Sequence, residues 1–448
     1  MASREIVASS APARNTIASS ATGNYVRPLA IVTTLFFMWG FITSLNDILV
    51  PHLKSIFDLS YTHAMLIQFA FFSAYFLFSV PWSKVVNAIG YRKTMVVGLV
   101  TMGIGAALFV PSASAASFPL FLTALMILAA GITGLQVSAN PYVIVLGKPE
   151  TASSRLNLTQ AFNSLGTTLA PTLGGVLILS AAPLAIASGS ELSSQALRVY
   201  RAQQASSVKM PYIIISIVLV LLAVAIAKSN LPTIKQAVGY SGKKITDSIW
   251  KHPNLFFGAL GIFAYVGAEV SIGSFMVSYL GQPEIAGYSP HTAAGYVSFY
   301  WGGAMVGRFI GAAVLQKVKT RHLLAVCAVC TATLVTVSML TTGHLAMWSM
   351  IAVGFFNSIM FPSIFTLGVA ELGPLTGSGS GLINMAIVGG AIIPVIQGAI
   401  ADRIGIHHAF VMPVICYFYI LFYALSGSKP NSERYENAPL TGPSALCN

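Results

Sequence analysis

The chain has 448 residues, of which 55% are hydrophobic and only 8% are charged. Soluble domains carry roughly 25% charged residues, so the composition excludes an ordinary soluble protein and predicts a polytopic membrane protein. The net charge of +12 does not indicate a nucleic-acid partner, because the basic residues are spread along short segments between apolar runs.

Successive apolar runs, separated by polar or Gly- and Pro-containing breaks, follow one another along the chain. A helix of about 20 residues is long enough to cross a bilayer, and the runs reach that length. The sequence therefore predicts an all-α membrane protein with twelve transmembrane helices. The expected ranges are 28–53, 62–86, 92–112, 118–146, 157–181, 209–229, 254–280, 291–315, 321–341, 344–369, 378–400 and 407–426.

The polar segments divide the chain into two bundles. The first 27 residues are rich in Ala and Ser and lack the apolar core of a signal peptide. The longest internal polar stretch lies near the middle of the chain and contains several lysines. We expect a flexible cytoplasmic tail, a six-helix bundle, a cytoplasmic linker, a second six-helix bundle and a second tail, at 1–27, 28–229, 230–253, 254–426 and 427–448.

Lysine and arginine are distributed unevenly between the two sides of the predicted bundle. With both termini inside, 19 of the 24 fall in cytoplasmic segments, a set that includes Arg155 and Arg308. Cytoplasmic segments of membrane proteins carry an excess of Lys and Arg, so both termini are predicted to be cytoplasmic. The five on the other side are Lys54, Arg198, Arg201, Lys209 and Arg403.

The two halves of the sequence resemble each other at a constant offset of 221 residues, as between Asn163 and Asn384. Six helices in each half would make the two copies parallel, and parallel repeats place a substrate site at their interface near the bilayer midplane. Further matched pairs are Gly40 and Gly261, Tyr75 and Tyr296, Gly90 and Gly311, Pro141 and Pro362, Leu146 and Leu367, Gly147 and Gly368, and Glu150 and Glu371.

Two acidic residues, Asp47 and Glu269, fall well inside predicted helices, each in the first helix of its half. An acid near the centre of such a helix costs about 2.5–3.5 kcal/mol on insertion scales, so a polar cavity, a proton or a bound cation must compensate. A buried carboxyl group can take up a proton or a cation and release it later. Both residues are predicted to couple transport to a cation; the alternative is a structural hydrogen bond to a neighbouring helix.

Neutral amides accompany these acids inside the predicted helices. Amide groups donate and accept hydrogen bonds, so they suit an uncharged substrate rich in hydroxyl groups. Aromatic rings could pack against the C–H face of a sugar ring, although aromatic residues in membrane bundles are more often packing or interface residues. The candidate substrate-binding residues are Asn46, Gln136, Asn140, Gln160, Asn163, Asn357, Asn384, Trp39, Tyr265 and Trp301.

Motifs for other chemistries are missing. The sequence contains no P-loop, no H-E-x-x-H and no Ser/His/Asp set, so an enzyme is not expected. Cys327 and Cys330 form a C-x-x-C inside an apolar helix, where small apolar thiols are the expected interpretation. We expect no cofactor besides a cotransported proton or sodium ion, and the one candidate metal position is a sodium site near Asp47.

The segment from Phe37 to Lys54 resembles the fucose–galactose–hexose transporter family of the major facilitator superfamily. The resemblance extends through both halves and is greatest to the bacterial glucose/galactose transporters. It implies the major facilitator fold, import of a neutral hexose by cation symport, a location in the bacterial inner membrane, and a monomer. The other matching motifs run from Leu135 to Tyr142, from Arg155 to Gly166 and from Tyr265 to Val270.

The resemblance also assigns roles to particular residues. In the fucose–proton symporter of this family, the acid matching Asp47 acts in sugar binding and coupling, and the amides matching Gln160 and Asn163 line the sugar cavity. That symporter uses a glutamate where this chain has Gln136, which cannot titrate, and Glu269 could replace it. Some members couple to sodium, which carboxylate and amide oxygens can bind.

The sequence leaves other functions open. Members of the same family carry fucose or N-acetylglucosamine instead of glucose or galactose. A drug exporter or antiporter would need an apolar cavity. A sugar receptor with a transporter fold would bind sugar without flux, and would be expected to carry a folded signalling domain.

Overall fold

The computed structural model describes residues 25–57, 61–115, 117–174, 209–232 and 248–429. Within these ranges every regular element is a helix, which confirms the predicted all-α class. Most of the predicted tails and of the predicted linker lies outside the described residues, so the domain boundaries stay predictions.

The first group of helices follows the predicted spans closely. The fifth predicted span begins five residues early, at Ala152 instead of residue 157, and its predicted end at residue 181 lies outside the described residues. The elements are α1 (Val26–Phe57), α2 (Tyr61–Ile89), α3 (Tyr91–Ser114), α4 (Phe118–Val145), the 3-10 turn η2 (Pro149–Thr151), α5 (Ala152–Gly174) and α7 (Lys209–Lys228).

The second group contains helices that are interrupted where the sequence predicted continuous spans. The predicted span 344–369 is broken after Asn357, and the predicted span 378–400 contains a 3-10 turn. The helices are α8 (Pro253–Leu280), α9 (Pro290–Val314), α10 (Thr320–Leu340), α11 (Gly343–Asn357), α12 (Met360–Gly368), α13 (Thr376–Met385), α14 (Gly389–Ile404), α15 (Ile406–Ala409) and α16 (Val411–Phe422). The shorter turns are η4 (Ile249–Lys251), η5 (Gly373–Leu375), η6 (Ala386–Val388) and η7 (Tyr423–Gly427).

Ten segments of the described chain are long and apolar enough to cross a membrane. Helices α5 and α9 have the length but are not among the ten. The two helices pack against each other at the contact between the two groups, so each has one side that faces protein. A helix that faces other protein can carry polar side chains, which explains why these two are less apolar.

The two groups repeat the same packing pattern. In the first group α3 packs on α4 and α7, and α1 packs on α5. In the second group α10 packs on α11 and α16, and α8 packs on α14. Because the equivalent elements occur in the same order along the chain, the internal repeat predicted from the sequence is present in the fold.

Glycines allow the close approach of α1 and α5. A Cβ atom at Gly40 would overlap the backbone carbonyl of Asn163, and one at Gly166 would overlap the carbonyl of Phe37. Small residues at such contacts let two membrane helices approach closely enough for backbone and side-chain contacts. This approach brings the amide of Asn163 within reach of the α1 backbone.

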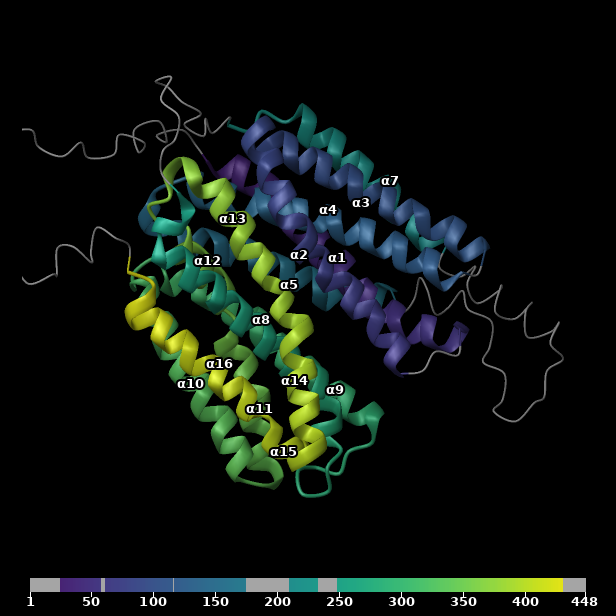
Figure 1. Ribbon diagram of the computed structural model, residues 1–448, viewed down its shortest axis with the longest axis vertical. Coiled ribbons are helices and arrows are strands. Elements are labelled where there is room, and N and C mark those ends of the chain that lie inside the picture. Colours follow the sequence, from purple (N-terminus) through teal and green to yellow (C-terminus); the bar gives the residue numbers. More distant parts are fainter. Residues whose placement is uncertain (1–24, 58–60, 116, 175–208, 233–247, 430–448) are drawn as a thin grey trace, which may run out of the picture.

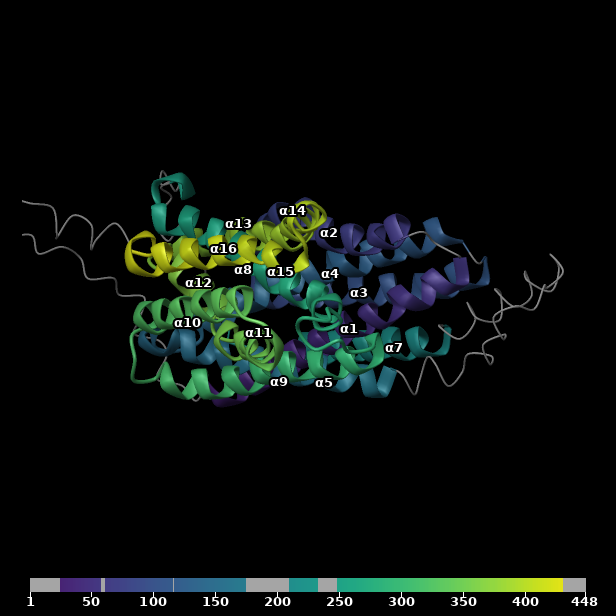
Figure 2. The same ribbon diagram turned by 90° about the horizontal axis from the view of Figure 1, so that it is seen from below.

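The two groups contact each other through α5 with α9 and through α13 with α2 and α4. Figure 1 shows them together where α13 passes α2, with their far ends, at the α3–α4 turn and at α15, well apart. The view in Figure 2 places α9 beside α5. The contact between the groups is therefore stronger at one end of the molecule than at the other.

Candidate functional site

The two predicted residues Asn46 and Asp47 belong to α1, whose backbone continues to Phe57. Their side chains are not among the parts of the chain that the structure describes. The roles predicted for both residues, and for a sodium ion near Asp47, therefore stay predictions.

Two of the predicted amides form matching hydrogen bonds in the two groups. The Gln136 side chain on α4 donates to the hydroxyl of Tyr75 on α2 at 2.8 Å. The Asn357 side chain on α11 donates to the hydroxyl of Tyr300 on α9 at 2.9 Å. Both amides are buried, and each tyrosine is fixed by an amide from a neighbouring helix.

The amides of α5 face two different neighbours. Gln160 donates to Oδ1 of Asn140 on α4 at 3.5 Å, which is a long hydrogen bond. Asn163 donates to the backbone carbonyl of Phe36 on α1 at 2.9 Å. Three of the predicted sugar-binding amides are thus brought together at the contact of α1, α4 and α5.

Several buried amide atoms in this region have no hydrogen-bond partner among the described residues. They include Oε1 of Gln136, Nδ2 of Asn140 and Oδ1 of Asn357. A buried polar atom without a partner costs about 1–3 kcal/mol, so such groups usually await water or a ligand. Asn384 has one such oxygen as well, while its nitrogen donates to the Ser380 carbonyl at 2.8 Å.

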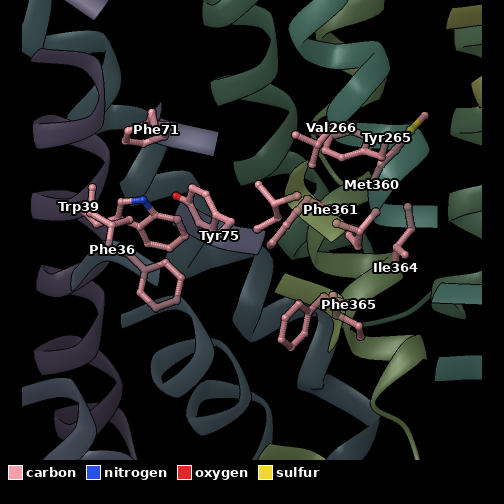
Figure 3. Packing of buried hydrophobic residues seen from close by; sticks show 14 of the residues in the cluster. Phe36, Trp39, Phe71, Tyr75, Tyr265, Val266, Met360, Phe361, Ile364 and Phe365 are labelled. Carbon is pink, nitrogen blue, oxygen red and sulfur yellow. The ribbon is translucent and has the colours of Figure 1, made fainter. Parts of the chain in front are cut away.

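Aromatic side chains from both groups belong to one cluster of buried residues. Figure 3 shows Trp39 of α1 beside Tyr75 of α2, with Phe361 and Tyr265 coming from the second group. Trp39 also packs against Phe36, with ring centroids 5.4 Å apart. The predicted aromatic residues Trp39 and Tyr265 are buried.

Trp301 differs from the other predicted residues because 42% of its surface is exposed. Its ring packs edge-on against Tyr300, with centroids 5.1 Å apart, and covers Gly273 of α8. Trp301 makes no hydrogen bond to a predicted amide among the described residues, so its role in substrate binding stays a prediction.

Glu269 lies in the middle of α8 and has two polar partners. The Tyr265 hydroxyl, one helical turn away, donates to Oε1 of Glu269 at 2.6 Å. The guanidinium Nη2 of Arg308 on α9 lies 3.9 Å from the same oxygen. Both charged side chains are largely buried, at 12% exposure for Arg308 and 14% for Glu269. Glu269 is therefore held as one member of an ion pair inside the second group.

Arg308 is a site residue that the sequence interpretation missed, because it was counted only among the cytoplasmic charges. The structure places it inside α9, where Nε donates to the Ser358 carbonyl at 3.2 Å and Nη1 donates to the Ser164 hydroxyl of α5. Gly307 lets α9 come close to Phe355 and Ser358, because a Cβ atom at this position would overlap both residues. Its position inside the predicted span 291–315 could have identified Arg308 as a partner for Glu269, the acid in the preceding predicted span.

Arg155 was also assigned to a cytoplasmic segment, and the structure shows it buried near the start of α5. Its guanidinium donates to the carbonyls of Val143 and Ile144 at 3.2 and 2.7 Å, and to that of Lys148 at 2.8 Å. The last carbonyls of a helix lack intrahelical partners, and a cation satisfies them well. Arg155 is thus a structural cap of α4.

The arrangement combines neutral amides with an acid in the second group that is balanced by a cation. Such a site can bind hydroxyl groups through the unpaired amide atoms and can respond to a cation at the carboxylate. It offers no activated nucleophile and, among the described residues, no group of three metal-binding His, Cys, Asp or Glu side chains.

Comparison with known proteins agrees with this geometry. The sequence model described as the Major Facilitator Superfamily matches residues 31–393. The chain belongs to this superfamily. Its members are transporters, so the predictions of a transporter rather than an enzyme and of a multi-pass bacterial inner-membrane protein are confirmed.

Individual relatives cover nearly the whole chain. A protein of Brucella abortus named glucose/galactose transporter is 51% identical over 94% of this chain and 100% of its own length. The L-fucose-proton symporter of Escherichia coli is 33% identical over 90% of this chain and 93% of its own. A crystal structure of the superfamily member FucP, in the outward conformation, aligns with a TM-score of 0.84 at 33% identity, covering 90% of this chain and 99% of that one.

Proposed function

We propose that this protein imports a neutral hexose, glucose or galactose, together with a cation by alternating access. The observation that carries the proposal is the 51% identity, over the full length of the relative, to a protein named glucose/galactose transporter. The buried amides at the contact of α1, α4 and α5 supply the hydrogen-bonding groups that such a substrate needs.

The proposed substrate site uses groups from both halves. Gln136, Asn140, Gln160 and Asn163 would bind hydroxyl groups from the first half, and Asn384 from the second. The unpaired atoms of Gln136 and Asn140 favour this role, because a sugar hydroxyl can both donate and accept a hydrogen bond. Trp39 is proposed to cover an apolar face of the sugar ring.

The proposed topology has twelve transmembrane helices and cytoplasmic termini. With this orientation, the end at which α13 meets α2 is cytoplasmic, and the separated ends face outward. An outward-facing state agrees with the similarity to FucP in the outward conformation. A monomer in the bilayer is proposed as the working unit.

Cation coupling is assigned to Asp47 and Glu269. One elementary charge moving across about 100 mV supplies about 2.3 kcal/mol, which corresponds to roughly fifty-fold accumulation of the sugar. The coupling ion is a proton or sodium. A proton is favoured by the relative named as a proton symporter, whereas the amide at Gln136, which cannot titrate, leaves sodium as the alternative.

Fucose is the second candidate substrate, because the L-fucose-proton symporter is 33% identical over 90% of this chain. Counterflow separates the candidates. Proteoliposomes loaded with unlabelled glucose should take up labelled glucose transiently, and external galactose should compete. If only fucose or N-acetylglucosamine competes, the hexose assignment is wrong. If no sugar exchanges while the protein is folded, the transport proposal itself is contradicted.

A further inference from the structure

Arg308 is a cation at the contact between the two groups of helices. It lies in α9 of the second group and donates to the hydroxyl of Ser164 in α5 of the first group. The same guanidinium lies 3.9 Å from Glu269 and donates to the Ser358 carbonyl at the break between α11 and α12. One side chain therefore connects the acid of the second half to the first half.

The contact of α5 with α9 continues from Arg308 toward the predicted cytoplasmic side. The Ser154 hydroxyl donates to the Ala312 carbonyl at 2.6 Å. Beside this contact, the Thr320 hydroxyl at the start of α10 donates to the Ser153 hydroxyl of α5 at 2.9 Å. In alternating access these bonds must break before the substrate can leave to the cytoplasm. Arg308 thus belongs to the contact that closes the cytoplasmic side, and on its other side the same contact continues to Thr168 and Met305.

The charge balance around Arg308 depends on Glu269. Among the described residues, the other titratable groups within electrostatic range of Glu269 are neutral hydroxyls, those of Tyr265, Tyr300 and Tyr417. If Glu269 binds a proton or another cation, Arg308 becomes a buried positive charge that no other carboxylate of the described residues balances. An unpaired charge inside a membrane protein is costly unless water reaches it.

We propose that Arg308 transmits the charge state of Glu269 to the α5–α9 contact. With Glu269 ionised, the guanidinium is balanced and holds Ser164, so the cytoplasmic side stays closed. With Glu269 neutralised, the unbalanced guanidinium weakens this contact, and separation of α5 from α9 lets water solvate it. Arg308 is a positioning residue in this account, and the inference rests on the proposed transport function.

The test measures opening of the cytoplasmic side without any sugar. All four native cysteines are replaced, and Ala312→Cys is introduced as a probe, because Ala312 is buried at the α5–α9 contact. A membrane-impermeant maleimide is then added to inside-out vesicles. A minor state populated at roughly 0.1–10% becomes the major one when its competitor is destabilised, so Glu269→Gln should raise labelling at least about tenfold.

The decisive comparison is the double variant. If Arg308 carries the signal, Glu269→Gln with Arg308→Gln should label several-fold more slowly than Glu269→Gln alone, because no unbalanced cation remains. Glu269→Asp keeps the charge and should label like the parent. The exposed acid Glu284, in the turn after α8, supplies the matched control, and Glu284→Gln should label like the parent.

Equal labelling of the single and double Glu269 variants would overturn the inference, as would unchanged labelling in Glu269→Gln. Each variant must elute as a single folded species, and Glu269→Ala serves as the second neutral variant if Glu269→Gln folds poorly. Because the labelling needs no substrate, a failure here is distinguishable from a failure of the transport proposal, which the counterflow of the parent protein tests separately.

Discussion

Gln136 and Asn357 occupy equivalent positions in the two halves, 221 residues apart, and each donates an amide hydrogen to a buried tyrosine hydroxyl. The tyrosines, Tyr75 and Tyr300, are one helical turn out of register with each other. In both pairs the amide oxygen has no partner among the described residues. The two halves thus share a buried amide oxygen that can accept a hydrogen bond, on α4 in the first half and on α11 in the second.

Replacing these amides should weaken sugar binding. Gln136→Ala removes an acceptor and leaves the Tyr75 hydroxyl without its donor, so the half-saturation concentration for sugar exchange should rise about tenfold, the effect of about 1.4 kcal/mol. Counterflow at several sugar concentrations measures it. Gln316→Ala, at an exposed position after α9, is the control and should change nothing. An unchanged half-saturation concentration in Gln136→Ala would remove Gln136 from the sugar site.

How much of the fold could be predicted depends on which physical constraints produce a recognisable pattern in the sequence. Apolar runs must match the bilayer thickness, so the helices could be located to within a few residues. The breaks after Asn357 and at η6 are hidden in the apolar pattern, which continues through both. Their signals are local: Pro362 has no N–H to donate to the Ser358 carbonyl, which accepts from Arg308 instead, and Gly389 and Gly390 follow η6.

The site was predicted less completely, and the reason is the treatment of arginine. Counting Arg155 and Arg308 as cytoplasmic charges was reasonable for the positive-inside rule, yet both side chains are held inside the protein. Arg155 satisfies helix-end carbonyls and Arg308 balances Glu269. Partners of this kind come from elements distant in sequence, so one-dimensional patterns do not indicate them.

Removing the Tyr265 hydroxyl should impair coupling more than folding. Tyr265→Phe keeps the ring packed against Phe361 but removes the 2.6 Å hydrogen bond to Glu269. A hydrogen bond to a charged group is worth about 1.5–3 kcal/mol, so gradient-driven uptake should fall at least about tenfold. Initial uptake rates in proteoliposomes measure it.

Tyr279 on the same helix is the matched control, since its buried hydroxyl interacts with Ser338 and not with Glu269. Tyr279→Phe should retain most of the uptake per folded molecule. Equal losses in the two variants would mean that the Tyr265 hydroxyl acts only in packing.

A methyl group at Gly40 should destabilise the α1–α5 contact. Its Cβ would overlap the Asn163 carbonyl, and overpacking of this kind costs about 1–3 kcal/mol. Gly40→Ala should therefore lower the melting temperature of the detergent-solubilised protein. Gly295 in α9 is the control, because a Cβ there meets nothing within 4 Å and alanine favours a helix. A Gly40→Ala protein as stable as the Gly295→Ala protein would contradict the packing described here.

Asp47→Asn should separate coupling from exchange. The substitution removes a charge while keeping the size of the side chain, so accumulation of sugar against its gradient should be lost while counterflow persists. Uptake with and without an imposed cation gradient measures both. Glu284→Asn, outside the bundle, should leave both activities unchanged. Concentrative uptake by the Asp47→Asn protein would exclude Asp47 as a coupling residue.

The most direct test of the central claim is uptake of labelled glucose into proteoliposomes under an imposed sodium gradient, and then under an imposed proton gradient. Cation symport predicts accumulation above the external concentration with one of the two gradients, and its collapse when an ionophore dissipates that gradient. Glucose that equilibrates without accumulating under either gradient, in vesicles where counterflow is active, would contradict cation coupling.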